Sequence, residues 1–154
     1  MQTRLGSKVV RRPWLGNIVL VAVVGCASAH RASPEFIAAT SGPSRPFSPA
    51  VRANGFLFLS GQVGTDSTGR VVAGGIQAET RQTMSNISAV LVRAGSSLDK
   101  VVKCTVFMAD MTEWGAMNEV YVTFFPQRRP ARSAAGASGL ALGAKVEIEC
   151  IAAE

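Results

Sequence analysis

The feature that most constrains the fold is one long run of helix-spaced apolar residues with strand-like segments on both sides. From Ile76 to Ala94 the apolar and small side chains recur three or four residues apart, and Gly95 follows as a stop signal. Before this run, Asn54-Gly55 lies between two short strand-like segments and predicts a hairpin. After it, residues 100–108 have the pattern of a buried strand. This order indicates an α+β fold.

The second half of the chain extends the same pattern. Residues 112–125 are predicted to form a second helix, with Thr112 as a candidate N-cap and Pro126 as its stop. Strands are expected around Arg132 and at 145–152. The elements together predict an antiparallel-rich mixed sheet with both helices on one face. A length of 154 residues and a hydrophobic content of 47% suit one domain with a packed core.

The first 25 residues are expected to be an export signal. They carry four basic residues and no acidic ones, and this basic start leads into an apolar run at 14–24. As a helix the run would be about 16 Å long at 1.5 Å per residue, which is too short to span a bilayer. A basic start followed by a short apolar region is typical of a cleaved signal peptide.

Two cleavage sites compete within this segment. Val23-Val24-Gly25-Cys26 resembles a bacterial lipoprotein box, in which Cys26 is lipidated and becomes the first mature residue. Ala27-Ser28-Ala29 fits ordinary signal peptidase, which would release a soluble protein beginning at His30. The lipoprotein interpretation is favoured because Cys26 directly follows the apolar run. It predicts a signal peptide at 1–25, a flexible tether at 26–45 and a folded domain at 46–154.

The charge of the expected mature chain argues against nucleic acid as a partner. The whole chain has a formal charge of +6, but four of its sixteen basic residues lie in the first 25 positions. The remaining twelve basic residues stand against ten acidic ones, which gives a net charge of +2. This balance argues against a nucleic-acid partner, and contact with a membrane is expected only through the lipid anchor.

The cysteines and the histidine limit the chemistry further. Cys104 and Cys150 each lie in an apolar strand-like run, where a buried thiol is the favoured interpretation and a disulfide the alternative. His30 is the only histidine, and no zinc-type Cys/His spacing is present. A metal site or a His-based catalytic triad is therefore not expected.

Arg132 is the only charged residue between Ala131 and Ala144. A guanidinium keeps its proton, so burying it among small apolar residues requires an anionic partner. The nearest downstream acids, Glu147 and Glu149, lie on an expected strand, and side-chain alternation places both on one face. On spacing alone, Arg132 is either half of a structural ion pair or the anchor of an anionic ligand, and the two acids are indistinguishable.

Several separate motifs, in the right order, resemble those of the RidA/YjgF family. The resemblance runs from residue 46 to residue 153, which is essentially the whole expected domain. The motifs are Pro46-Phe47-Ser48-Pro49-Ala50-Val51, Phe58-Leu59-Ser60-Gly61-Gln62, Val106-Phe107-Met108-Ala109-Asp110, Asn118-Glu119-Val120-Tyr121-Val122-Thr123-Phe124-Phe125, Pro130-Ala131-Arg132-Ser133 and Val146-Glu147-Ile148-Glu149.

The resemblance implies a fold, an assembly and an activity. The fold would be the chorismate-mutase-like α+β domain, and the assembly a homotrimer with three clefts between subunits. The activity of the best-known branch is the hydrolysis of reactive 2-enamino and 2-imino acids to 2-oxo acids and ammonia. An imine is already electrophilic, so this reaction needs no metal, nucleophilic cysteine or organic cofactor.

The resemblance also implies roles for particular residues. Arg132 offers a forked, permanently charged donor that suits bidentate capture of the substrate's carboxylate. Glu149 matches the family's water-positioning carboxylate, which would place water against the imine carbon and accept its proton. The backbone N–H groups of Ser133 and Ala134 would bind charge that develops during the reaction.

The remaining cleft residues have structural alternatives. Ser60 and Gly61 would shape the cleft, but a tight backbone approach explains the pair as well. Asn118 would reach a neighbouring subunit, or would cap or bridge secondary structure. Phe47 would contact the substrate where many deaminases have Tyr, and Ala134 stands where they often have Cys. The missing hydroxyl and thiol concern the range of substrates more than the fold.

Three functions are compatible with these residues. The leading hypothesis is an exported enamine/imine deaminase, and the second is a non-catalytic module that binds a small carboxylate. The third and weakest is a holdase-like interaction protein that would act independently of Arg132. Export favours an unfamiliar substrate or a binding role, because the familiar imines are made by cytosolic enzymes that use pyridoxal phosphate.

Overall fold

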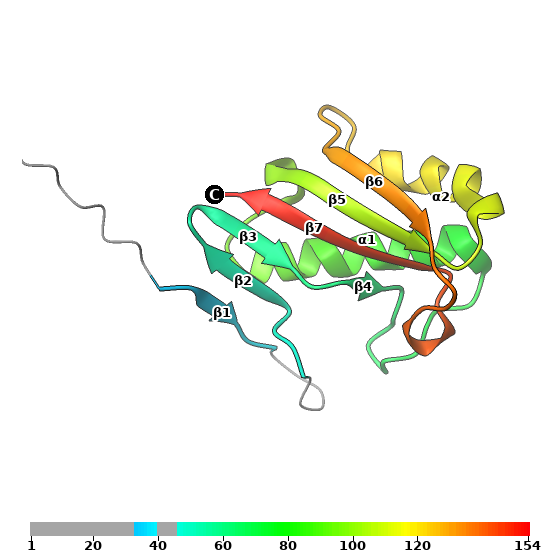
Figure 1. The fold of residues 1–154 in the computed structure, drawn as a ribbon, viewed down its shortest axis with the longest axis horizontal. Helices are drawn as coiled ribbons and strands as arrows, with labels where there is room; N and C mark the ends of the chain where they lie inside the picture. The colour runs from blue at the N-terminus through cyan, green and yellow to red at the C-terminus, as the bar shows by residue number, and fades with distance from the viewer. Residues whose placement is uncertain (1–32, 40–45) are drawn as a thin grey trace, which may run out of the picture. The chain divides into compact units, whose positions relative to one another are not determined.

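The computed structural model describes residues 33–39 and 46–154, which belong to one folded unit (Figure 1). The expected signal peptide, Cys26 and most of the expected tether lie outside the described residues. Within the described ranges, no helix is both long enough and apolar enough to cross a membrane.

One seven-stranded sheet forms the framework, in the order β1-β2-β3-β7-β5-β6, and β4 pairs with β7 as well. The pairings are antiparallel except that of β5 with β6, which is parallel. The expectation of an antiparallel-rich mixed sheet is confirmed. The strands are β1 (Glu35–Ile37), β2 (Ala50–Ala53), β3 (Phe56–Leu59), β4 (Gln62–Val63), β5 (Val101–Met108), β6 (Ala131–Gly136) and β7 (Val146–Ala153).

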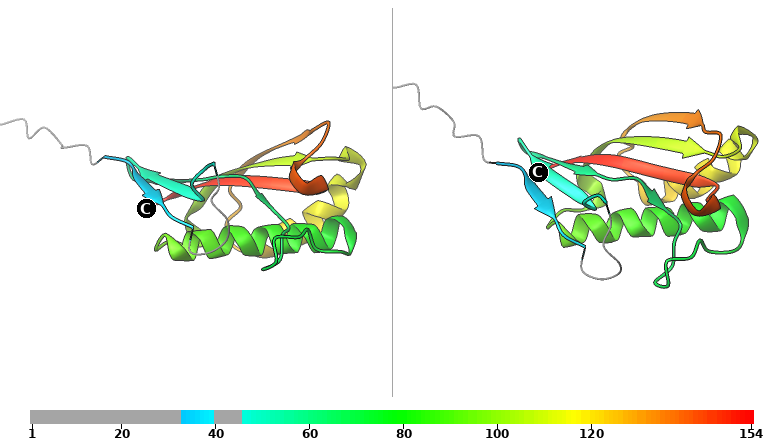
Figure 2. Two further views of the ribbon diagram at one scale, coloured as in Figure 1. Left: turned by 90° about the horizontal axis from the view of Figure 1, so that it is seen from below. Right: turned by 60° about the horizontal axis from the view of Figure 1, so that its bottom comes forward.

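Both helices, α1 (Gly75–Arg93) and α2 (Trp114–Tyr121), cover the same face of the sheet, as expected (Figure 2). The buried residues of α1 recur at helical spacing and pack on alternate residues of β5 and β7 in one core. The helix ends where Gly95 takes a positive φ of 75°, which a residue without a Cβ adopts at little cost. The opposite face of the sheet carries no helix in the described part of the chain.

The second helix is shorter than the sequence predicted. The α-helical part covers 114–121, and 3-10 turns at Met111–Glu113 and Val122–Phe124 flank it. Asp110, and not Thr112, caps the first of these turns: its Oδ1 accepts hydrogen bonds from the backbone N–H of Thr112 at 2.8 Å and from its Oγ1 at 2.7 Å. These hydrogen bonds, led by that from the hydroxyl, lower the pKa of the Asp110 carboxyl.

Part of the segment expected to be a flexible tether is an ordered strand, β1. Residues 35–37 lie inside the range expected to be flexible, yet they pair antiparallel with β2, and Ile37 is buried in the core. Charge helps to hold this strand, because Arg52 of β2 forms salt bridges with Glu35 and with Glu154 near the end of the chain. The prolines on either side of this segment favoured the interpretation as a flexible tether, although residues 35–37 form a short strand at the edge of the sheet.

The favoured interpretation of Cys104 and Cys150 as free thiols is wrong, although both residues are buried. They form a disulfide between β5 and β7, where they lie directly opposite each other. Their Cα atoms are 4.1 Å apart, as the close pairs of an antiparallel ladder are. The bond therefore joins two central strands at residues that are 46 positions apart in sequence.

We expect this disulfide to stabilise the folded domain by about 2–4 kcal/mol, because it closes a long loop in the unfolded chain. Equilibrium unfolding in guanidinium should shift to a lower midpoint when dithiothreitol is present. The double variant Cys104→Ala/Cys150→Ala provides the control, since it retains Cys26 and should unfold identically with and without reductant. A wild-type midpoint that is indifferent to reductant would contradict the expectation.

Candidate functional site

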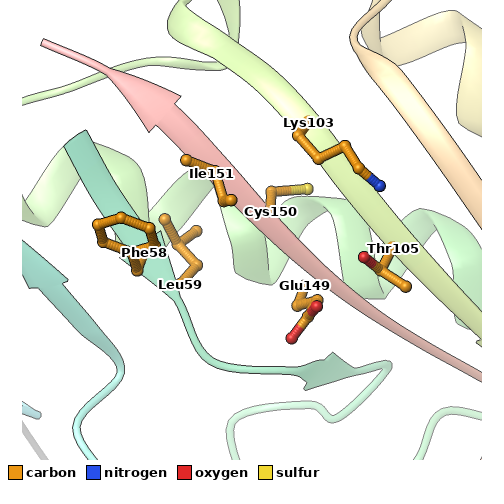
Figure 3. Close-up of a pocket in the computed structure, with 7 residues that line it drawn as sticks. All are labelled: Phe58, Leu59, Lys103, Thr105, Glu149, Cys150 and Ile151. Atoms are coloured by element: carbon orange, nitrogen blue, oxygen red, sulfur yellow. The ribbon is translucent and has the colours of Figure 1, made fainter.

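An interruption of the hydrogen-bond ladder opens a hollow beside Glu149. On one side of β7, Phe58 of β3 pairs with Ile151 and Gln62 of β4 pairs with Ile148. Between these points the chain leaves the ladder, and Glu149 and Cys150 have no strand partner on that side. The hollow measures about 130 Å³ (Figure 3), and its lining residues are Phe58, Leu59, Lys103, Thr105, Glu149, Cys150 and Ile151.

Ser60 and Gly61 occupy the interruption but do not line the hollow. The Ser60 hydroxyl donates to the carbonyl of Ser48 at 2.7 Å, and its backbone N–H donates to the carbonyl of Pro49 at 3.0 Å. A Cβ at Gly61 would lie 2.0 Å from Oε1 of Glu147. These contacts support the structural alternative for both residues: Ser60 ties the chain to the segment before β2, and Gly61 leaves room for a carboxylate.

The far end of the interruption is held by α1. Asn86 donates from its Nδ2 to the carbonyls of Val63 at 2.9 Å and Thr65 at 3.0 Å. At Gly64 a Cβ would lie 2.7 Å from the backbone oxygen of Glu79, so only glycine permits this approach. These contacts hold the chain beside β4 against the helix, and between β3 and β4 the pairing with β7 is interrupted.

The two candidate acids lie on one face, as alternation predicted, but in different surroundings. Both point to the face opposite the helices. Glu147 is half-buried and packs over Gly61. Glu149 is exposed and lies in the hollow, next to Thr105 of β5. The structure thus distinguishes two residues that spacing could not.

Cationic and hydroxyl groups share the face of Glu149. Thr105 pairs with Glu149 on one side and with Ser133 on the other, so the three side chains lie on the same face. Lys103, two residues before Thr105, donates from its Nζ to the Ser133 hydroxyl at 3.2 Å. The face thus combines an ammonium group, two hydroxyls and a carboxylate.

Arg132 lies on the other face of the sheet. Its partner in the ladder is Cys104, which in turn pairs with Cys150, and both cysteines face the helices. Within one chain, Arg132 and Glu149 are therefore on opposite faces. No salt bridge joins Arg132 to a carboxylate anywhere in residues 33–39 and 46–154, so the expected alternative of an Arg132–Glu149 ion pair is wrong.

Aromatic rings of α2 surround Arg132 instead. The guanidinium carbon lies 4.7 Å from the ring centroid of Tyr121 and 5.8 Å from that of Trp114. Asn118 lies between these residues on the helix, and its Oδ1 is buried without a hydrogen-bond partner, as is the Tyr121 hydroxyl. The two aromatics were not among the site residues expected from the sequence, although the spacing 114, 118, 121 places them with Asn118 on one helix face.

The other expected site residues are dispersed. Phe47 is exposed and precedes Ser48, the residue that accepts the Ser60 hydrogen bond. Ala134 pairs with Val106 and packs against the core. Its strand, β6, is the last of the described sheet, so the backbone groups along its outer side have no strand partner within the described part of the chain.

In the described ranges, no three His, Cys, Asp or Glu side chains lie close enough together to hold a metal.

The titratable group with the clearest perturbation near Arg132 is Tyr121. Burial raises the pKa of its hydroxyl to about 12, while the charge of Arg132 acts in the opposite direction. The hydroxyl therefore stays neutral at ordinary pH.

Tyr121 is the only tyrosine of the chain, so absorbance near 295 nm reports its titration alone. We expect the tyrosinate to form near pH 12 in the folded protein. Because the folded pKa is raised from its ordinary value near 10, this group's contribution to stability is complete below about pH 10 and is lost as the pH rises through 12. Arg132→Ala should raise the pKa further, whereas Lys103→Ala, on the other face, should not. Equal titration of all three proteins would contradict the placement of Arg132.

Known proteins match the chain over nearly the whole described domain. A family model described as Endoribonuclease L-PSP matches residues 38–154. A 2-iminobutanoate/2-iminopropanoate deaminase of Mus musculus is 41% identical over 121 residues, which cover 77% of this chain and 90% of the relative. Reactive Intermediate Deaminase A, chloroplastic, of Arabidopsis thaliana is 37% identical over 128 residues, which cover 81% of this chain and 68% of the relative.

Solved structures match to a similar extent. The Yersinia pestis protein YyfA, of the conserved Rid protein family, is 39% identical with a TM-score of 0.74, over 79% of this chain and 100% of its own. TdcF of E. coli with bound serine is 32% identical with a TM-score of 0.72, over 78% and 98% of the two chains. These matches confirm the expected fold. The chain belongs to the RidA/YjgF family.

Proposed function

We propose that this protein hydrolyses reactive 2-enamino or 2-imino acids to 2-oxo acids and ammonia. The observation that carries the proposal is a pair of charged groups without countercharges: Arg132 and Glu149 form no salt bridge in the described part of the chain. Glu149 lines the hollow, and Arg132, on the other face, has no carboxylate partner, so each group is available to a charged ligand. The mouse relative, named as an imine deaminase, supports the same reaction.

Each group has a chemical task in this reaction. The Arg132 guanidinium would bind the substrate's carboxylate through two parallel N–H donors. The Glu149 carboxylate would hold a water against the imine carbon and accept its proton as the C–O bond forms. Backbone N–H groups of successive residues point to opposite sides of a strand, so either Ser133 or Ala134, on the unpaired outer side of β6, would stabilise charge at the reacting centre. Glu149 then returns the proton to the nitrogen of the resulting carbinolamine, the C–N bond breaks to release ammonia, and the hydroxyl loses its proton to give the 2-oxo acid.

The two groups act on one substrate only if two copies of the chain form the site. Arg132 and Glu149 lie on opposite faces of their own sheet, so the cleft would combine Arg132 of one copy with Glu149 of another. The helix-free face supports such packing, since it exposes the aromatic rings of Phe56 and Phe58. We therefore propose a homotrimer with a cleft at each of its three interfaces.

The reaction can be tested with an imine generated in situ from an amino acid and an amino-acid oxidase. Added protein should accelerate the release of ammonia and 2-oxo acid, and Arg132→Ala should abolish the acceleration. Glu149→Gln should lower the rate about 100-fold or more, as loss of a general base does. The matched variant Glu147→Gln alters an acid on the same face of the same strand and should retain most of the activity.

Two results would contradict the proposal. One is the absence of any acceleration by the wild-type protein, and the other is undiminished acceleration by Arg132→Ala. Equal losses in the two glutamate variants would instead contradict the assignment of Glu149 as the base.

A second candidate function is a binding module for a small amino or oxo acid. The relative TdcF, whose crystal structure contains bound serine, favours this function because serine is a small amino acid with a carboxylate. Phe47 and Ala134 favour it too, because they lack the hydroxyl and thiol expected in many deaminases. In a binding module, Glu149→Gln would leave the affinity largely intact while Arg132→Ala removes it, and neither the wild type nor a variant would turn over an imine.

We also propose that the protein is exported and anchored by a lipid on Cys26. The support is the sequence alone: a basic start, a short apolar run and Cys26 directly after it. Expression with a radiolabelled fatty acid should label the wild-type protein and not the variant Cys26→Ala. Label that persists in Cys26→Ala would exclude the anchor.

A further inference from the structure

An arginine without a carboxylate partner still has to be held in one orientation if it is to bind a ligand. Arg132 belongs to β6, the strand that passes over α2 (Figure 1), and the rings of Trp114 and Tyr121 lie within 6 Å of its guanidinium carbon. A cation over an aromatic ring is attracted to the negative face of the ring. The arrangement gives Arg132 two neutral contacts in place of a countercharge.

The two rings differ in how firmly they are held. Tyr121 is only 3% exposed and packs against Phe125, with ring centroids 5.1 Å apart. Trp114 is 44% exposed and lies one helical turn before Asn118 on the same side of α2. Tyr121 therefore supplies a fixed surface within the core, and Trp114 a ring at the boundary with solvent.

Contact with aromatic rings leaves the binding capacity of a guanidinium intact. A ring attracts the guanidinium through the charge of the group and offers no carboxylate oxygen to its N–H donors, so the donors stay available to a ligand. A carboxylate of the protein would occupy them and would compete with a ligand. Rings thus orient an arginine while keeping its forked edge free.

We propose that Trp114 and Tyr121 are positioning residues that hold the Arg132 guanidinium for a carboxylate ligand. The inference rests on the proposed carboxylate-binding role of Arg132 and assigns to the rings the task that an acidic partner performs elsewhere. A tyrosine hydroxyl is neutral at working pH, so the Tyr121 hydroxyl is not an anion that would pair with Arg132.

The test uses the full chain and pyruvate, a stable 2-oxo acid, as the probe. Trp114→Leu removes the ring, and Trp114→Phe retains an aromatic face at the same position. We expect Trp114→Leu to raise the Kd for pyruvate, measured by calorimetry, about tenfold, and Trp114→Phe to change it less than about threefold. In the imine assay Trp114→Leu should raise KM with little change in kcat, since the carboxylate contact serves substrate and transition state alike.

Tyr121 is tested by its own conservative variant. Tyr121→Leu removes this ring and should raise the Kd for pyruvate about tenfold. Tyr121→Phe keeps the ring, removes only a hydroxyl that has no hydrogen-bond partner, and should restore most of the affinity. A tenfold loss in Tyr121→Phe would overturn the positioning role of this ring. Thermal unfolding of each variant checks that the domain remains folded, as we expect for changes at the half-exposed Trp114.

The outcomes separate this inference from the proposed function. If Arg132→Ala loses pyruvate binding while Trp114→Leu binds like the wild type, the positioning role is overturned and the proposed function stands. If Arg132→Ala binds pyruvate as well as the wild type does, or the wild type does not bind it, the carboxylate-binding role fails and the inference with it. Weakening by Trp114→Leu with rescue by Trp114→Phe supports the inference.

Discussion

The register between β5 and β7 is the constraint on which the other features depend. Pairing Cys104 with Cys150 and Thr105 with Glu149 determines which side chains enter the core and which face away from the helices. A slip of β7 by one residue would turn Glu149 toward α1 and into the core. The β7 side chains that now pack against α1 would then face solvent. The disulfide joins the two strands at this point, and the parallel pairing of β6 with β5 then places Arg132 on the helix side.

Most of the fold could be predicted because its elements follow simple periodicities. The helix from residue 76 onward, the hairpin at Asn54-Gly55 and the central strands all appear near their expected positions. The errors have causes that lie outside the local sequence. The interruption after Leu59 depends on contacts with α1 through Gly64 and Asn86, which no local pattern encodes. The short strand β1 is stabilised by its partner and by Arg52, so its own sequence shows little of it.

The candidate site was predictable only in part, for a different reason. Motifs predicted Arg132 and Glu149 as site residues, and this stays a prediction, whereas alternation correctly placed Glu147 and Glu149 on one face. The separation of Arg132 and Glu149 to opposite faces required the pairing partners of three strands, which a single sequence does not reveal. The rings of Trp114 and Tyr121 were missed because their contact with Arg132 depends on how α2 packs against β6, which the sequence does not show. Predicting the disulfide also required the pairing of β5 with β7, since only the register shows that Cys104 and Cys150 are opposite each other.

The placement of Arg132 and Glu149 on opposite faces has a consequence for how activity depends on assembly. On the proposed arrangement, each chain contributes its arginine to one cleft and its carboxylate to a different one. A correctly folded monomer would then be complete as a structure and inactive as a catalyst. In that arrangement folding and activity would be separable properties, and dilution would remove the activity while each chain stays folded.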